Sequence, residues 1–146
     1  MRTFYLTAAA SLLLDQLSKL LVANYLFRPL VLLPGLAVLR HVQNPGAAFG
    51  LFAQRNLFLI LAGFLLVLIF LLAYNRIRQA PLFWRAGAGL ILGGTLGNLL
   101  DRLRLGHVVD FIDLGFWPVF NLADIAITCG VGIIILSLLR ERSEWS

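Results

Sequence analysis

The sequence predicts a mainly α membrane protein, in which four transmembrane helices carry a small extracytoplasmic β-sheet cradle and a short amphipathic helix on the membrane surface. The chain of 146 residues is 60% hydrophobic and 13% charged, and its mean hydropathy of +0.90 lies outside the range of soluble globular domains. Four apolar stretches each approach the ~20 residues that cross ~30 Å of hydrocarbon as a helix. Residues 1–146 are therefore expected to form a single membrane domain.

The four expected helices span about 4–26, 57–74, 83–100 and 122–139. Arg2 gives the first stretch the positive start of a signal peptide, but Asp15 and Lys19 interrupt its middle and no small-x-small cleavage site follows, so we expect a retained helix. Cys129 lies in the fourth stretch without a His or Cys partner nearby, which favours a buried, small apolar role.

Two outer loops, 27–56 and 101–121, connect the expected helices, and the first has the composition of ordered structure. Within the first, "LVLLPGLAVLRHV" is rich in Leu and Val and is broken by Pro34 and Gly35, which predicts two short strands around a turn. "NPGAAFGLF" follows and is typical of an amphipathic piece that lies on the membrane surface. An ordinary packed loop remains the alternative for the whole region.

Arginines near helix ends set the expected orientation, because cytoplasmic ends are rich in Lys and Arg. With both termini cytoplasmic, the inner side holds Arg2, Arg76, Arg78, Arg85, Arg140 and Arg142, against Arg28, Arg40, Arg55, Arg102 and Arg104 outside. The bias is slight in total but clearer in the short 75–85 loop and the tail. The net charge of +5 is scattered without a basic run, which indicates contact with membrane lipid and no nucleic-acid partner.

Glycines mark the third helix. Gly89, Gly93 and Gly97 recur every four residues and form a small-residue stripe that lets helices approach closely in lipid. Asp101 continues the series, so we expect it to face protein at the outer membrane boundary. Asn98, one turn deeper, is a buried amide that needs partners.

Asp15 and Lys19 are charged residues in the middle of the first apolar stretch, where each costs ~2.5–3.5 kcal/mol on insertion scales. The acid precedes the lysine by four residues, which is the better order for an ion pair on a helix. A structural strut between helices is favoured over a transport path, because we expect no other segment to carry an ionisable group at similar depth.

Four of the seven acidic residues gather between the third and fourth helices: Asp101, Asp110, Asp113 and Asp124. The two helix ends share one membrane surface, so a short connector brings acids together. Two carboxylates held close cannot both ionise easily, and such a pair can act as general base and general acid. For Asp124 alone, the plain alternative is a capping role, with Asn121 as N-cap.

Other catalytic chemistries lack their residues. The chain has no His-Glu-x-x-His motif, no Cys/His ligand set and no Gly-x-Ser-x-Gly elbow, so neither a metal nor a serine mechanism is expected. His41 and His107 are expected in hydrogen-bonding or surface roles. The residues themselves leave open whether Asp101 or Asp110 is the partner of Asp124.

Five stretches together resemble the lipoprotein signal peptidases of bacteria, also called signal peptidase II. They are "DQLSK" at 15–19, "NPGAAFG" at 44–50, "GGTLGNLLDR" at 93–102, "VVDF" at 108–111 and "FNLAD" at 120–124. The resemblance implies a four-helix membrane aspartic endopeptidase, without a cofactor or metal. Such enzymes cut the signal peptide from a prolipoprotein just before a cysteine that carries diacylglycerol.

The resemblance also implies roles for individual residues. Asp110 and Asp124 would be the catalytic dyad, and Asp15 and Lys19 a pair that stabilises the bundle. The substrate-binding or supporting residues would be Asn44, Gly46, Asn98, Asp101, Arg102, Asn121 and Ala123. Asp113 falls outside the motifs and is treated as a bystander, whereas Asp101 is expected to pair with Arg102 or Arg104.

The protein is expected to act as a monomer in the bacterial cytoplasmic (inner) membrane, with its active site at the outer face and lipidated prolipoproteins as partners. Two alternatives from other classes stay open. A proton- or ion-coupled transporter would use Asp15, because intramembrane carboxylates mark ion paths. A structural subunit would use the glycine stripe to bind partner helices.

Overall fold

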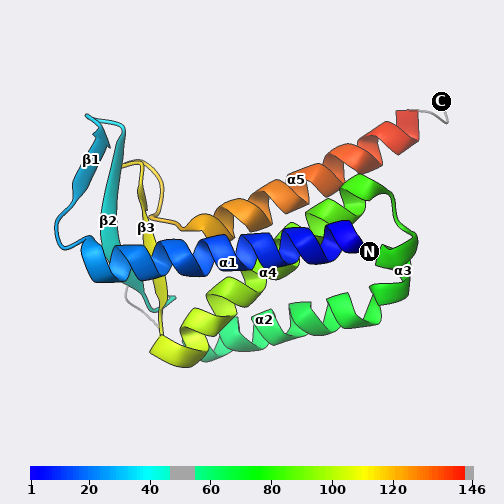
Figure 1. Ribbon diagram of the computed structural model, residues 1–146, viewed down its shortest axis with the longest axis horizontal. Coiled ribbons are helices and arrows are strands. Elements are labelled where there is room, and N and C mark those ends of the chain that lie inside the picture. The colour runs from blue at the N-terminus through cyan, green and yellow to red at the C-terminus, as the bar shows by residue number, and fades with distance from the viewer. Residues whose placement is uncertain (47–54, 144–146) are drawn as a thin grey trace.

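The computed structural model describes residues 1–46 and 55–143. The elements follow one another as α1 (Arg2–Tyr25), β1 (Leu30–Leu33), β2 (Ala37–Asn44), α2 (Arg55–Leu72), α3 (Tyr74–Gln79), α4 (Leu82–Leu105), β3 (Val108–Asp113) and α5 (Leu122–Ser143). Figure 1 shows the sheet at one end of the long helices, and the N-terminus, α3 and the C-terminal end of α5 at the other. Each of the four expected helices is present.

α4 runs further than the sequence predicts. We expected a helix that ends at 100, but it continues to Leu105 and stops at Gly106, whose φ of 78° is left-handed. The Gly106 N–H donates to the Arg102 carbonyl at 3.1 Å, which is the usual way in which glycine ends a helix. Asp101 therefore lies one turn inside α4.

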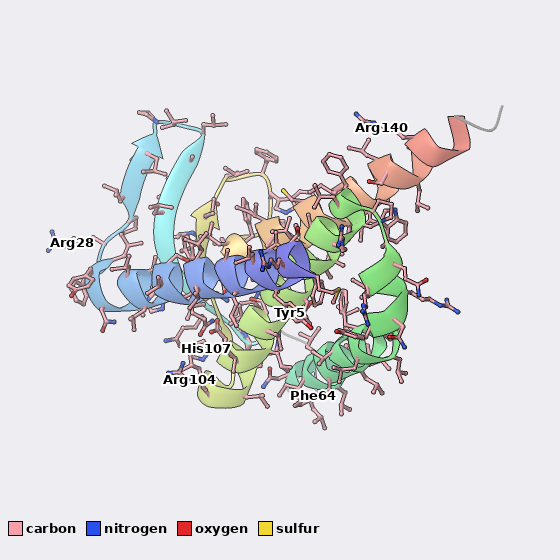
Figure 2. All side chains as sticks on the ribbon, turned by 45° about the vertical axis from the view of Figure 1, so that its right-hand side comes forward. Tyr5, Arg28, Phe64, Arg104, His107 and Arg140 are labelled. Carbon is pink, nitrogen blue, oxygen red and sulfur yellow. The ribbon has the colours of Figure 1, made fainter. Side chains whose placement is uncertain are left out.

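Two of the described helical segments qualify as membrane spans by length and hydropathy, Arg2–Tyr25 and Leu122–Arg140. The apolar part of α2, Asn56–Leu72, is shorter. Many large apolar side chains point outward, including Leu13, Leu61 and Leu136, while Asp15, Lys19 and Asn121 are buried. Figure 2 shows Arg28 and Arg104 toward the sheet end and Arg140 at the opposite end. The four-span arrangement stays a prediction.

The sheet has three antiparallel strands in the order β1-β2-β3. β1 and β2 are the two strands expected around Pro34 and Gly35. β3 lies in the second outer loop, where no strand was predicted, and pairs with β2 so that Val42 faces Asp110 and Asn44 faces Val108. The expected cradle is therefore built from both outer loops. The amphipathic piece predicted after Asn44 falls mostly on 47–54, outside the described residues.

α4 lies between α1 and α5 because glycines line both of its contact faces. A Cβ atom on Gly93 would collide with Ser11 and with the Ala8 carbonyl of α1, and one on Gly89 would collide with Thr7. On the other side, a Cβ atom on Gly94 would lie 2.5 Å from the Ala123 carbonyl of α5. The predicted close approach along the glycine stripe is confirmed, and it brings polar groups of three helices together.

Candidate active site

Asp110 lies in β3 and is held by two amides. Its Oδ1 accepts a hydrogen bond from Asn121 Nδ2 at 2.7 Å, and its Oδ2 accepts one from Asn44 Nδ2 at 2.8 Å. Asn44 reaches it as a diagonal neighbour on β2. The Gly46 N–H donates to Asn44 Oδ1 at 2.9 Å, and the left-handed φ of 84° at Gly46 turns the chain for this contact. Gly46 therefore orients the Asn44 amide toward Asp110.

Asp124 lies in the first turn of α5. Its N–H donates to Asn121 Oδ1 at 3.0 Å, and its Oδ2 accepts from the Asn121 N–H at 3.2 Å. This reciprocal pair is a capping box, so the predicted capping role is confirmed. The other oxygen, Oδ1, accepts from Asn98 Nδ2 on α4 at 2.9 Å. Capping therefore occupies only one of the two carboxylate oxygens.

Asn121 connects the two acids. It is fully buried, and its Nδ2 donates both to Asp110 and, at 3.1 Å, to Asn98 Oδ1. Burial raises the pKa of Asp110 to about 6, and the charge of Asp124 adds to the rise, while hydrogen bonds from Asn44 and Asn121 and the charge of Lys19 oppose it. The two acids therefore belong to one electrostatic site, and Asp110 titrates close to neutral pH.

Lys19 stands at the centre of a second cluster, which shares Asn98 with the first. Its Nζ lies 2.8 Å from Asp15 Oδ2 and 2.9 Å from Asp101 Oδ2, and it donates to Asn98 Oδ1 at 2.9 Å. Asp15 also accepts from the backbone N–H of Ala123 at 2.9 Å. Ala123 thus contributes its backbone, and Asp15 satisfies one of the free N–H groups at the start of α5.

Two expectations about these charges are wrong. Asp101 forms its ion pair with Lys19 and not with Arg102 or Arg104, because it lies on the face of α4 that packs against α1. The premise that no other segment brings an ionisable group to the depth of Asp15 and Lys19 fails for the same reason. The expected i, i+4 pair is thus part of a three-residue cluster.

Arg102 takes part through its own helix. Its Nη1 donates to the Asn98 carbonyl at 3.2 Å, and its guanidinium faces Asp124, Asp110 and Asp101 electrostatically. Gln16 was not among the predicted site residues, yet its Nε2 donates to Asp101 Oδ1 at 3.0 Å and to the Gly97 carbonyl at 3.2 Å. The signal that could have identified Gln16 is its position, since it is an amide in an apolar helix, one residue after Asp15.

An apolar groove of about 380 Å³ opens beside Asp124. Its walls come from the loop before α5 and from one face of α5: Leu114, Phe116, Trp117, Phe120, Ile125, Thr128 and Cys129. Cys129 is exposed, so its predicted burial is wrong: hydropathy does not distinguish a side chain that faces a groove or lipid from one that faces a core. The aromatic residues of this loop were also not predicted as part of the site.

Asp113 lies apart from Asp110 and Asp124. It pairs with Arg40 at 2.6 Å, where the arginine side chain is about half exposed, and its Oδ1 accepts from the Gly115 N–H. Within residues 1–46 and 55–143, His, Cys, Asp and Glu form no group of three that could hold a metal ion. The structure therefore brings together Asp110, Asp124 and their predicted supporting residues, and leaves Asp113 outside the network.

Comparison with known proteins gives a consistent result. A family model described as "Signal peptidase (SPase) II" matches residues 7–140. The chain is 45% identical to a lipoprotein signal peptidase of Moorella thermoacetica, with 97% of this chain and 95% of that one covered. It is 50% identical to a lipoprotein signal peptidase of Syntrophomonas wolfei, with 90% of each covered.

Solved structures agree with these relatives. A structure described as a bacterial membrane enzyme superposes with a TM-score of 0.88 at 29% identity and covers 100% of this chain and 93% of its own. A second structure with the same description gives a TM-score of 0.87 at 30% identity, with 95% and 94% covered.

Proposed function

The chain belongs to the signal peptidase II family, and we propose that it removes the signal peptide from prolipoproteins whose cysteine already carries diacylglycerol. Family membership supports the broader activity, removal of signal peptides from lipoproteins by a membrane protease. The finer proposal is an aspartic endopeptidase mechanism. In it, Asp110 and Asp124 activate water and cut on the N-terminal side of the lipidated cysteine.

The observation that carries this proposal is the connection of both acids through Asn121. One side-chain amide donates to Asp110 and, through its oxygen, accepts from the N–H of Asp124. Asp110 lies on a strand and Asp124 on a helix. Their connection is therefore made by the fold and not by local chain geometry. Two acids held in one network in this way are the arrangement that general acid–base hydrolysis requires.

Charge balance supports a single shared proton. Among the described residues, the connected network holds four carboxylates, those of Asp15, Asp101, Asp110 and Asp124, and two cations, Lys19 and Arg102. Lys19 lies against Asp15 and Asp101. Because uncompensated buried charge is costly, the remaining two acids are stabilised by keeping one proton between them. The proton belongs to the pair and is not assigned to either acid.

The proposed reaction uses water and no cofactor. The ionised carboxylate takes a proton from water as the water oxygen bonds to the scissile carbonyl carbon, and the protonated carboxyl gives its proton to the carbonyl oxygen. The tetrahedral intermediate then breaks its C–N bond, and the amine leaves with the proton taken from water. One hydroxyl of the intermediate returns its proton to the other carboxylate as the carbonyl re-forms, which restores the dyad. We propose that Asn44 holds Asp110 in place and, from the same position, also binds the substrate backbone.

The apolar groove beside Asp124 suits a lipidated substrate. Phe116 and Trp117 are among the most exposed large side chains of the chain, and both line the groove. We propose that the substrate enters sideways from the membrane along this surface. With the termini at one end and the sheet at the other (Figure 1), four spans would place the site at the outer face and both termini in the cytoplasm.

The contacts of Asp15 and Lys19 do not favour the alternative that the protein is a transporter. The three hydrogens of the Lys19 ammonium have three acceptors, Asp15, Asp101 and Asn98. Asp15 is in turn held by Lys19, Gln16 and the Ala123 N–H. A pair fixed in this way has the properties of a buried structural network and not those of an ion path.

The proposed function is tested by cleavage of a diacylglyceryl-modified prolipoprotein with purified protein in detergent. Asp110→Asn and Asp124→Asn are expected to insert normally and to cut at least ~100-fold more slowly, because each removes a group needed for proton transfer. Asp113→Asn is the matched control, since Asp113 lies on the same strand as Asp110 but pairs with Arg40, outside the network that connects Asp110 and Asp124.

The outcomes distinguish a wrong function from a wrong assignment of the dyad. Cleavage by wild type and Asp113→Asn alone would support both the function and the dyad. Substantial cleavage by Asp124→Asn would refute the dyad. A folded wild type that leaves the lipidated substrate intact would refute the proposed function.

A further inference from the structure

Lys19 contacts more than its expected partner. Its side chain is buried, and its three short contacts reach α1 itself through Asp15 and α4 through Asp101 and Asn98. A strut that only neutralises charge needs the two carboxylates. The contact with the neutral Asn98 amide is not needed for charge neutralisation. The same amide donates a hydrogen bond to Asp124.

The Asn98 amide has one productive orientation. Its Oδ1 accepts from Lys19 Nζ at 2.9 Å, and its Nδ2 donates to Asp124 Oδ1 at 2.9 Å. Rotation of the amide by 180° would set its NH₂ against an ammonium, which has no acceptor, and its oxygen against a carboxylate, which has no donor. Asn98 Oδ1 therefore accepts from two donors, the neutral amide of Asn121 and the charged ammonium of Lys19.

We propose that Lys19 is a positioning residue of the hydrolytic site, which acts on Asp124 through the amide of Asn98. This inference rests on the proposed function. Lys19 touches neither acid of the dyad. It holds Asn98 as a donor to the anionic form of Asp124, and charge-assisted bonds of this kind are the strong ones.

The same segment of α1 also holds the backbone that carries Asp124. Asp15 Oδ1 accepts from the Ala123 N–H, one residue before Asp124. One turn of α1 thus fixes the start of α5 through Asp15 and the hydrogen-bond donor to Asp124 through Lys19. The two contacts can be separated by mutation.

The decisive variant is Lys19→Met combined with Asp15→Asn, because Lys19→Met alone leaves both Asp15 and Asp101 without a cation. Asp15→Asn alone is the matched control, since it keeps the contact between Lys19 and Asn98. Folding is measured by thermal unfolding and gel filtration in detergent, and cleavage of the lipidated prolipoprotein is measured over a range of pH.

Relative to Asp15→Asn, the double variant is expected to lose roughly tenfold or more in kcat, or ~1.4 kcal/mol, with KM changed less than about twofold. The acid limb of its pH profile should move to higher pH, because the positive charge of Lys19, which opposes the raised pKa of Asp110, is lost. The charged groups that act on Asp110 are Lys19 on α1, Arg102 on α4 and Asp124 on α5. A purely structural Lys19 would leave this profile unchanged.

A folded double variant with the kcat and pH profile of Asp15→Asn would overturn the proposal, while cleavage by wild type would leave the proposed function standing. If the double variant does not fold, Lys19→Met with Asp101→Asn is compared with Asp101→Asn in the same way. Failure of both pairs to fold would assign Lys19 to stability alone and would also overturn it. A wild type that does not cleave would instead refute the proposed function.

Discussion

Replacement of Asn121 tests how one buried side chain serves two acids. Its Oδ1 caps α5 through the N–H of Asp124, and its Nδ2 donates to Asp110 Oδ1 at 2.7 Å. An N-cap contributes about 1 kcal/mol, and a hydrogen bond to a charged group about 1.5–3 kcal/mol. Asn121→Ala loses both and should lower the free energy of unfolding by about 2.5–4 kcal/mol.

Asn121→Ser separates the two contributions. Serine is a good N-cap but is too short to donate to Asp110, so this variant should be about 1 kcal/mol more stable than Asn121→Ala. Both variants should cleave poorly, because both leave Asp110 with the single donor Asn44. Denaturant- or heat-induced unfolding in detergent, beside the cleavage assay, measures the two effects on the same samples.

The sign of the pH effect follows from Asp110. Its pKa is about 6 in the folded protein against an ordinary value of 3.8, so the folded state favours the protonated acid. The stability from this preference is fully present below pH 3.8 and is lost as the pH rises through 6. Removal of Asn121 takes a donor from the anion and raises this pKa further.

The stability deficit of both Asn121 variants should therefore be larger at pH 8, where Asp110 is ionised, than at pH 5. Equal stability of the Ala and Ser variants would refute the capping role assigned to the Asn121 side chain. A deficit that does not change between these pH values would refute its role as a donor to ionised Asp110.

Three further predictions concern the packing and the surface. Gly93→Ala should destabilise the bundle by about 1–3 kcal/mol through overpacking, whereas Gly132→Ala, where a Cβ atom meets nothing within 4 Å, should stabilise it by up to about 1 kcal/mol; thermal unfolding compares them. A bulky maleimide should label exposed Cys129 and slow cleavage, because it fills the groove beside the dyad, and the Cys129→Ser protein should keep its activity under the same treatment. Arg40→Gln should cost less than about 1 kcal/mol, since the Arg40 side chain is 47% exposed and water screens its pair with Asp113; a larger loss would show that the pair supports the sheet.

Local patterns predicted much of this molecule. The helices, the hairpin around Pro34 and Gly35, and the capping of α5 by Asn121 all depend on neighbours in sequence. The glycine stripe of α4 was also predictable, because a four-residue period fixes one helix face. β3 was missed because it is short and buried, and because its partner strand lies more than 60 residues earlier in the chain.

Contacts across the fold could not be predicted from the residues alone. Lys19 has an acidic neighbour four residues away, which satisfied the local rule, yet its other contacts come from α4. The choice of Asp110 over Asp101 as the partner of Asp124 came from the family resemblance. The structure supplies a physical reason for that choice: Asp101 lies against Lys19, whereas Asp110 shares Asn121 with Asp124.

The location of the polar cluster has a consequence for how the chain assembles during synthesis. α1 emerges first, and its Lys19 can be neutralised at once by Asp15 within the same helix, so this helix carries no net charge from the pair into the bilayer. The Ala123 N–H and the Asn98 amide, by contrast, find Asp15 and Lys19 only after the later helices have arrived. Assembly of α1 with α4 and α5 is therefore the step that completes the hydrogen bonds of the candidate site.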